Sequence, residues 1–128
     1  MSVGLVIVTH GQIGHALIEA AEFILDRSLQ SVRCVAVTQS GAEMPDEASM
    51  REVIRGADQG DGVLILTDLA CASPSNIAEQ QLPSCPATVV SGINLPMLLR
   101  VWNYRDEPLE QLAERACQGG LKGIGIRT

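Results

Sequence analysis

Aromatic residues are almost absent from this 128-residue chain, which holds one Phe, one Trp and one Tyr, or 2% of its residues. The hydrophobic fraction is nevertheless 46%, so the core has to be built from Val, Ile, Leu, Ala and Met. This aliphatic composition excludes a disordered chain and favours a parallel sheet covered by helices over an all-β sandwich. The length fits a single domain, residues 1–128, that forms a core without metal or disulfide bridges.

Clusters of basic residues are also missing. The nine Lys and Arg residues are scattered among fifteen Asp and Glu, and the formal net charge is −6. Because nucleic acids and anionic membrane surfaces require a basic patch, we expect neither as a partner. No apolar run is long enough to span a bilayer, and the first residues, "MSVGLVIV", lack the basic region and cleavage site of a signal peptide. We therefore expect a cytoplasmic protein without membrane insertion.

Cysteine is scarce and has no metal-binding pattern. Cys34, Cys71, Cys85 and Cys117 are widely spaced, with no C-x-x-C pair and no histidine at ligand spacing, so we expect no metal site. In the cytoplasm these thiols should be reduced. We predict that Cys34, Cys85 and Cys117 are small buried hydrophobic residues.

Glycine-rich nucleotide-binding motifs are lacking as well. Gly11 and Gly14 form only G-x-x-G, whereas the dinucleotide fingerprint needs three glycines in G-x-G-x-x-G. We therefore expect no cofactor.

What the sequence does contain is a regular alternation of strand and helix patterns. Apolar, β-branched runs predict strands over 3–8, 32–37, 63–68 and 86–91. Helical spacing, capping residues and helix-opening prolines predict helices over 12–26, 47–58, 74–82, 96–103 and 108–120. The tail, 123–128, is a candidate for one more short strand. Such alternation predicts an α/β fold with a parallel sheet, right-handed crossovers and helices on both faces.

Polar and small residues follow each predicted strand. His10 follows the first strand and Thr38 the second, while Asp68 and Ser91 are the last residues of the third and fourth. In parallel α/β sheets this carboxyl edge is where ligands bind. If the first and third strands are neighbours, Asp68 can hold one nitrogen of the His10 imidazole and leave the other free to attack an electrophile.

An anion pocket is predicted beside that pair. Ser73 and Pro74 are the expected start of a helix, where backbone N–H groups and the helix dipole favour an anion. A histidine, an aspartate and an anion pocket together describe a phosphohistidine site. The only other histidine, His15, is expected on the exposed side of the first helix without a catalytic role.

The chain resembles the IIA component of the mannose/fructose-type sugar phosphotransferase system. Three segments carry the resemblance: "LVIVTHGQIGHALIEAAEFIL", "GVLILTDLACASPSNIA" and "VVSGINLPMLL". The resemblance implies a three-layer fold whose mainly parallel sheet has the strand order 2-1-3-4. It also implies an added antiparallel carboxyl-terminal strand, which some members exchange between the subunits of a homodimer.

The resemblance also implies a role for each site residue. His10 would accept phosphate from the phosphocarrier protein HPr and pass it to a IIB partner. Asp68 would bond the Nδ1 atom of that ring, which leaves Nε2 to carry the phosphate. Ser73 would bind the phosphoryl oxygens with nearby backbone N–H groups, for which Gly11, Cys71 and Ala72 are the candidates. Family members have two glycines where this chain has Cys71 and Ala72.

Other functions are compatible with a histidine after the first strand. A dihydroxyacetone-kinase phosphodonor subunit shares the fold and the histidine. A chelatase-like domain would use the histidine as a metal ligand, but it needs a second ligand, for which His15 is poorly placed. A regulatory module would bind a partner and transfer nothing, so that no phosphate would pass through His10.

Overall fold

The computed structural model describes residues 2–38, 47–70 and 86–128. Its strands are β1 (Gly4–His10), β2 (Arg33–Val37), β3 (Val63–Thr67) and β4 (Ala87–Ser91). Its helices are α1 (Ile13–Leu25), α2 (Glu47–Ala57), α4 (Leu95–Asn103) and α5 (Leu109–Lys122). The strands form one sheet in the order β2-β1-β3-β4, and every neighbouring pair is parallel. The predicted α/β fold and the strand order 2-1-3-4 are confirmed.

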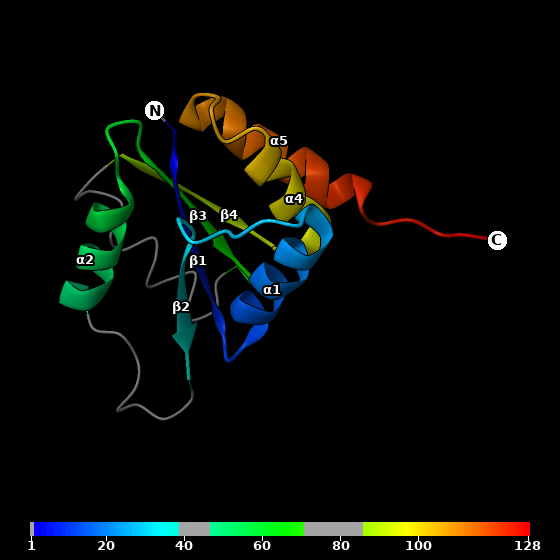
Figure 1. Cartoon of the computed structure of the whole chain (residues 1–128), viewed down its shortest axis with the longest axis horizontal. Helices are drawn as coiled ribbons and strands as arrows, with labels where there is room; N and C mark the ends of the chain where they lie inside the picture. The colour runs from blue at the N-terminus through cyan, green and yellow to red at the C-terminus, as the bar shows by residue number, and fades with distance from the viewer. Residues whose placement is uncertain (1, 39–46, 71–85) are drawn as a thin grey trace.

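Helices cover both faces of this sheet (Figure 1). The helix α2 lies on one face, and α1, α4 and α5 lie on the other. Successive side chains of β1 alternate between the two layers, because strand residues point to opposite faces in turn. Leu5 and Ile7 join the core under α1, α4 and α5, whereas Val6 and Val8 join the core under α2. Burial on both sides explains why β1 and β3 are continuous apolar runs rather than alternating ones.

Several apolar residues of the helix α1 lie outside its buried face. Gly14 and Ala21 are buried against the sheet layer, but Ile13 and Ile24 are 47% and 54% exposed. Phe23, the only phenylalanine, is 88% exposed. The apolar periodicity of this segment therefore marks the helix correctly without marking which residues face the core.

The helices α4 and α5 pack closely against each other. The Asn94 side chain accepts a hydrogen bond from the N–H of Met97 at 2.9 Å and so caps α4, and Pro96 lies in its first turn. On α5, a Cβ atom at Gly119 would come within 2.7 Å of the Arg100 Cβ, so a larger residue there would push the two helices apart. The helix α5 continues to Lys122, two residues beyond its predicted end.

This single chain differs from two predictions about its carboxyl-terminal region. Residues 124–128 form no strand; they are exposed and extend away from the sheet beyond the end of α5 (Figure 1). The tail pairs with none of the described strands of its own chain, because it runs away from the sheet beyond α5. Cys117 is exposed on α5 rather than buried.

Cys34 is half-buried, and burial raises the pKa of its thiol to about 11. It packs against the core as a partly buried residue, whereas a buried one was predicted. The other two cysteines, Cys71 and Cys85, lie outside the described residues, as does the predicted helix over 74–82.

Candidate functional site

His10 is the last residue of β1, two residues beyond the predicted end of that strand. It pairs with Val37 of β2, and its side chain is 44% exposed at the carboxyl edge of the sheet. The next residue, Gly11, has a φ of +49°, a backbone conformation that favours glycine, and its N–H donates to the Val37 carbonyl at 2.9 Å. The chain therefore turns sharply after His10 and leaves the imidazole at the rim of the sheet.

Asp68 holds His10 by two hydrogen bonds to a single oxygen. Its Oδ2 accepts from the backbone N–H of His10 at 3.0 Å and lies 2.9 Å from the Nδ1 atom of the ring. Because an ionised carboxylate only accepts, Nδ1 carries a proton in this contact and Nε2 has the free lone pair. The contact expected between His10 and Asp68 is thus present, and in the neutral ring it selects the tautomer in which the lone pair of Nε2 is free.

The charge of Asp68 is maintained by its neighbour. Partial burial raises the pKa of its carboxyl group, but the hydrogen bonds from the His10 backbone and ring, with the attraction of the ring, outweigh that effect. The net result is a pKa below the ordinary value for aspartate. Asp68 is therefore ionised at neutral pH and can stabilise positive charge on the imidazole.

Two buried side-chain oxygens, one in this pair and one next to it, have no hydrogen-bond partner within the described part of the chain. They are Asp68 Oδ1 and Thr67 Oγ1, and Thr67 is fully buried. Buried polar atoms are nearly always paired, so unpaired ones need an explanation. Hydrogen-bonding capacity left unused at the end of β3 fits a site that binds or reacts.

A second contact fixes the turn that carries His10. The hydroxyl of Thr9, which is fully buried, accepts a hydrogen bond from the N–H of Gly14 at 2.8 Å. A Cβ atom at Gly14 would lie 2.7 Å from Cys34 Sγ and 2.9 Å from Ile7 Cγ2, so only glycine lets α1 lie this close to β1 and β2. The sequence reading missed this role of Thr9 and Gly14. A polar residue that ends an apolar strand was the available signal.

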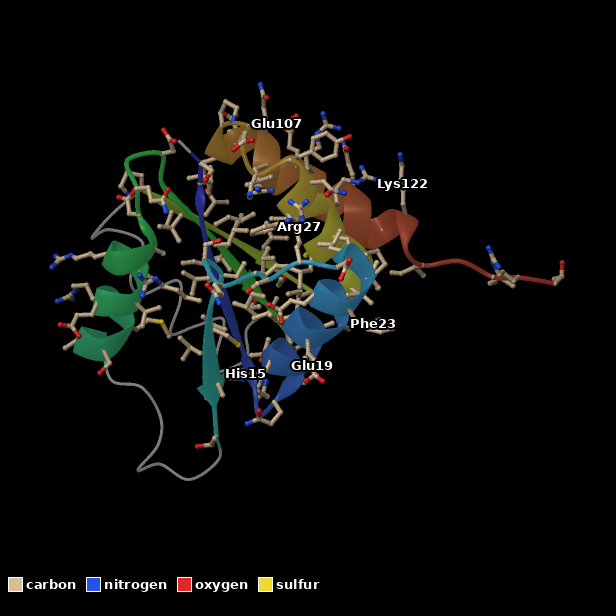
Figure 2. The ribbon with its side chains drawn as sticks, in the orientation of Figure 1. His15, Glu19, Phe23, Arg27, Glu107 and Lys122 are labelled. Carbon is tan, nitrogen blue, oxygen red and sulfur yellow. The ribbon has the colours of Figure 1, made fainter. Side chains whose placement is uncertain are left out.

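The remaining predicted residues are only partly placed. Gly11 lies next to His10, whereas Cys71, Ala72 and Ser73 are outside the described residues. His15 is exposed on α1, as predicted, and lies on the same helix as Glu19 and Phe23 (Figure 2). Its ring has no partner in the part of the chain that the structure describes.

The described residues contain neither a metal-binding cluster nor a membrane-spanning helix. They contain no group of three or more His, Cys, Asp or Glu side chains that could hold a metal ion. None of the helices described is both long enough and apolar enough to cross a bilayer.

Comparison with known proteins identifies the family. Residues 4–116 match the EIIA-man family model, described as the fructose IIA component of the phosphotransferase system (PTS). The chain belongs to this family. The match includes both residues of the His10–Asp68 pair and the whole of the sheet.

Individual relatives agree with that assignment. The chain is 28% identical over 127 residues to the PTS system mannose-specific EIIAB component of Escherichia coli K12, and the same values hold for that of Shigella flexneri. These alignments cover 97% of this chain but only 39% of each relative, so the chain spans about two fifths of their length.

Solved structures share the fold. The mannose/sorbose-specific IIA subunit from Enterococcus faecalis gives a TM-score of 0.81 at 21% identity, over 100% of this chain and 96% of that one. The PTS component EIIA from Streptococcus agalactiae gives 0.80 at 21% identity, over 97% and 96% of the two chains.

Proposed function

We propose that this chain is a phosphocarrier domain of the PTS, spanning residues 1–128, that accepts a phosphoryl group from phospho-HPr on Nε2 of His10. It then passes the group to a IIB partner or signals by its phosphorylation state. The observation that carries the proposal is the 2.9 Å contact between Nδ1 and Asp68 Oδ2, which directs the Nε2 lone pair of the neutral ring to the exposed rim of the sheet. Membership of the EIIA-man family supports it.

The transfer step follows from the tautomer. The Nε2 lone pair attacks the phosphorus of phospho-HPr, a new N–P bond forms, and the bond between phosphorus and the donor imidazole breaks. The proton on Nδ1 stays in place, so positive charge develops on the ring that Asp68 stabilises across its short contact. Transfer to the IIB partner repeats the step with His10 as the leaving group.

The oxygens of the phosphoryl group need donors of their own. We place Ser73 and the backbone N–H groups of Gly11, Cys71 and Ala72 in that role, which stays a prediction. No cofactor or metal is needed for this step, since both reacting groups are imidazoles. We also propose a cytoplasmic location, because the step requires a meeting with HPr.

Chemical labelling tests the proposal. The chain is incubated with phosphoenolpyruvate, enzyme I and HPr, and the bound phosphate is characterised by its stability and by ³¹P NMR. We expect one acid-labile, base-stable phosphate on Nε2, which is absent in His10→Ala. A wild-type chain that stays unlabelled, while a known IIA component is labelled in the same mixture, contradicts the proposal and favours a purely regulatory module.

The identity of the acceptor separates the nearest alternatives. Phosphate that moves on to a IIB protein supports sugar transport, whereas phosphate used only by a dihydroxyacetone-kinase subunit supports the phosphodonor function. Metal binding that disappears in His10→Ala, without any labelling, would support a chelatase-like domain.

The tail and the open sheet edge support a homodimer as the working form. Ile124 and Ile126 are 73% and 95% exposed and lie two residues apart, a spacing that puts both on one side of a strand. No described strand pairs with the outer edge of β4, and a cavity of about 390 Å³ beside it is lined largely by apolar atoms of β4 and α5. The tail of a second copy would pair antiparallel with β4 and seat its isoleucines in that cavity.

Light scattering on the protein as it elutes from a size-exclusion column tests whether the chain forms a homodimer. We expect a dimer for the full chain and a monomer for a chain that ends at Gly123. Ile126→Asp should weaken the dimer, whereas Ile24→Asp, which introduces the same charge on α1, should not. A dimer that survives the truncation contradicts the strand exchange.

A further inference from the structure

At the amino-terminal edge of the sheet lies a cavity whose charged lining residues are positive, although the protein as a whole is negative. The cavity has a volume of about 280 Å³ and lies where β1 and β2 begin and α2 ends. Two of its lining residues are arginines, Arg33 and Arg105, although the chain has a net charge of −6. No Asp or Glu among the described residues lines it.

Arg33 is held in place by the end of α2. Its Nη2 donates to the Gly56 carbonyl at 3.0 Å, and its guanidinium lies 3.3 Å from the position that a Cβ of Gly56 would occupy. That hydrogen bond uses one of the five donors of the guanidinium. The negative end of the α2 dipole is thus offset by Arg33, while the other donors remain available.

Arg105 is held by an aromatic ring. Its guanidinium lies 3.9 Å from the centroid of the Trp102 ring, and its Nη1 donates to the Trp102 carbonyl at 2.7 Å. Its backbone carbonyl accepts from the N–H of Val3 at 3.2 Å, which ties this segment to the start of β1. A planar cation fixed by stacking loses little conformational freedom when it binds an anion.

Neither arginine forms an ion pair with a described residue, and two acidic side chains, Asp58 and Glu22, accept hydrogen bonds from backbone N–H groups instead. Asp58 Oδ1 accepts from the N–H groups of Gly60 and Gly62 in the turn after α2. Glu22 Oε2 accepts from the N–H of Leu29 at the end of α1. No carboxylate of the described part of the chain therefore forms an ion pair with the two guanidinium groups at the cavity.

We infer that this cavity binds a small phosphorylated polyol or sugar. Guanidinium groups match the geometry of a phosphate, and uncharged amides and hydroxyls suit the hydroxyl groups of a polyol. Besides the arginines, the polar side chains that line the cavity are uncharged: Ser2, Gln30, Ser31 and Gln59.

The proposed site is separate from His10. The cavity is lined by Gly4 and Leu5, at the beginning of the seven-residue strand that ends at His10. A strand of that length places the two sites roughly 20 Å apart. Binding here consequently does not depend on phosphorylation of His10, and either proposal can fail without the other.

Amide NMR of the full chain tests the inference, with glucose 6-phosphate as the probe. We expect saturable shifts at Val3, Gly4, Leu5 and Ser31, weaker binding of inorganic phosphate, and no shifts with glucose. Inorganic phosphate that binds as tightly as the sugar phosphate overturns the assignment of a polyol. Shifts that centre on His10 and vanish in His10→Ala overturn the site itself.

Matched arginine variants complete the test. Arg33→Gln should weaken binding by about tenfold or more, because a charged hydrogen-bond donor is lost. Arg105→Lys keeps the charge and removes the planar fork, and it should weaken binding in the same direction. Arg55→Gln removes an arginine of α2 that does not line the cavity, and binding should change by less than about twofold. Affinity that is unchanged in Arg33→Gln and Arg105→Lys, with both variants folded, contradicts the inference.

Discussion

The two histidines of this chain lie on the same short segment but in different surroundings. His10 is at the tip of a strand that is otherwise buried on both faces, and one carboxylate oxygen holds both its backbone and its ring. His15 is on the exposed surface of α1 with no hydrogen-bond partner in the described residues. Both are imidazoles with access to solvent, so exposure does not distinguish them.

The difference is the fixed partner. Asp68 selects one tautomer of His10 and supplies a negative charge that would offset positive charge on the ring in the proposed phosphorylation. His15 has no such partner, so its ring can take either tautomer and rotate in water. The comparison indicates that the sheet, by bringing the ends of β1 and β3 together, turns an ordinary side chain into a candidate nucleophile.

Removal of each histidine gives the largest contrast. His10→Ala should form no phosphohistidine with phospho-HPr, because the attacking nitrogen is gone. His15→Ala should be labelled at a rate within about twofold of the wild type, as expected for a surface substitution. Radiolabel incorporation over time measures both.

The same experiment can break the comparison. Labelling of His10→Ala that disappears only when His15 is also replaced would mean that an unpartnered histidine on α1 accepts phosphate. The fixed partner would then be irrelevant to the reaction.

Asp68→Asn sharpens the comparison by making His10 resemble His15. The amide is uncharged and can offer its oxygen or its nitrogen to the ring, so the selection of the tautomer weakens. Loss of a charged hydrogen bond predicts a transfer rate about 10- to 100-fold lower. Rapid-quench kinetics with phospho-HPr measure the rate, and Asp106→Asn, an exposed aspartate away from the site, is the control. Equal rates for Asp68→Asn and the wild type remove Asp68 from the mechanism.

Much of the fold could be predicted because local patterns determine it. Continuous apolar runs such as Leu5–Val8 mark strands that are covered on both faces, and alternation with helices implies a parallel sheet. The tail could not be predicted in this way, because the pattern of Ile124 and Ile126 says nothing about which strand is within reach. The prediction of which α1 residues face the core failed for a similar reason. Gly14, and not the larger apolar residues, determines the closest approach of α1 to the sheet.

Only the part of the candidate site that depends on residue type and strand order could be predicted from the sequence. His10 and Asp68 each follow an apolar run, so parallel neighbours bring them to one edge. The contribution of Thr9 depends on a hydrogen bond across the turn to Gly14, and the two buried oxygens of Thr67 and Asp68 depend on packing. Such contacts can be identified only from a three-dimensional structure that includes the side chains.

Thr9→Val tests whether the orientation of His10 needs the turn as well as the carboxylate. Valine has nearly the same shape but cannot accept a hydrogen bond, so the N–H of Gly14 loses its partner in a buried place. Leaving a buried donor unpaired predicts a loss of about 1–3 kcal/mol in the free energy of unfolding. Urea denaturation measures it, and Thr9→Ser, which keeps the hydroxyl, should retain most of the stability.

A transfer rate measured on the same two variants separates positioning from stability. If the turn orients His10, Thr9→Val lowers the rate more than its unfolded fraction explains, and Thr9→Ser restores it. A rate that follows only the folded fraction limits Thr9 to a structural role.

The pH dependence of stability gives the smallest expected effect. The pKa of Asp68 is lower in the folded chain than in the unfolded chain, so the ionised carboxylate stabilises the fold at neutral pH. That contribution is present above the unfolded pKa and is lost as the pH falls through the folded one. For a partly exposed pair we expect the difference between the wild type and Asp68→Asn to be about 1 kcal/mol or less at neutral pH. Urea titrations should show the difference shrinking in acid, and the His15→Ala variant should keep the pH dependence of the wild type. A difference that grows in acid would mean that the carboxylate of Asp68 is destabilised by its surroundings, and that His10 is held by the turn alone.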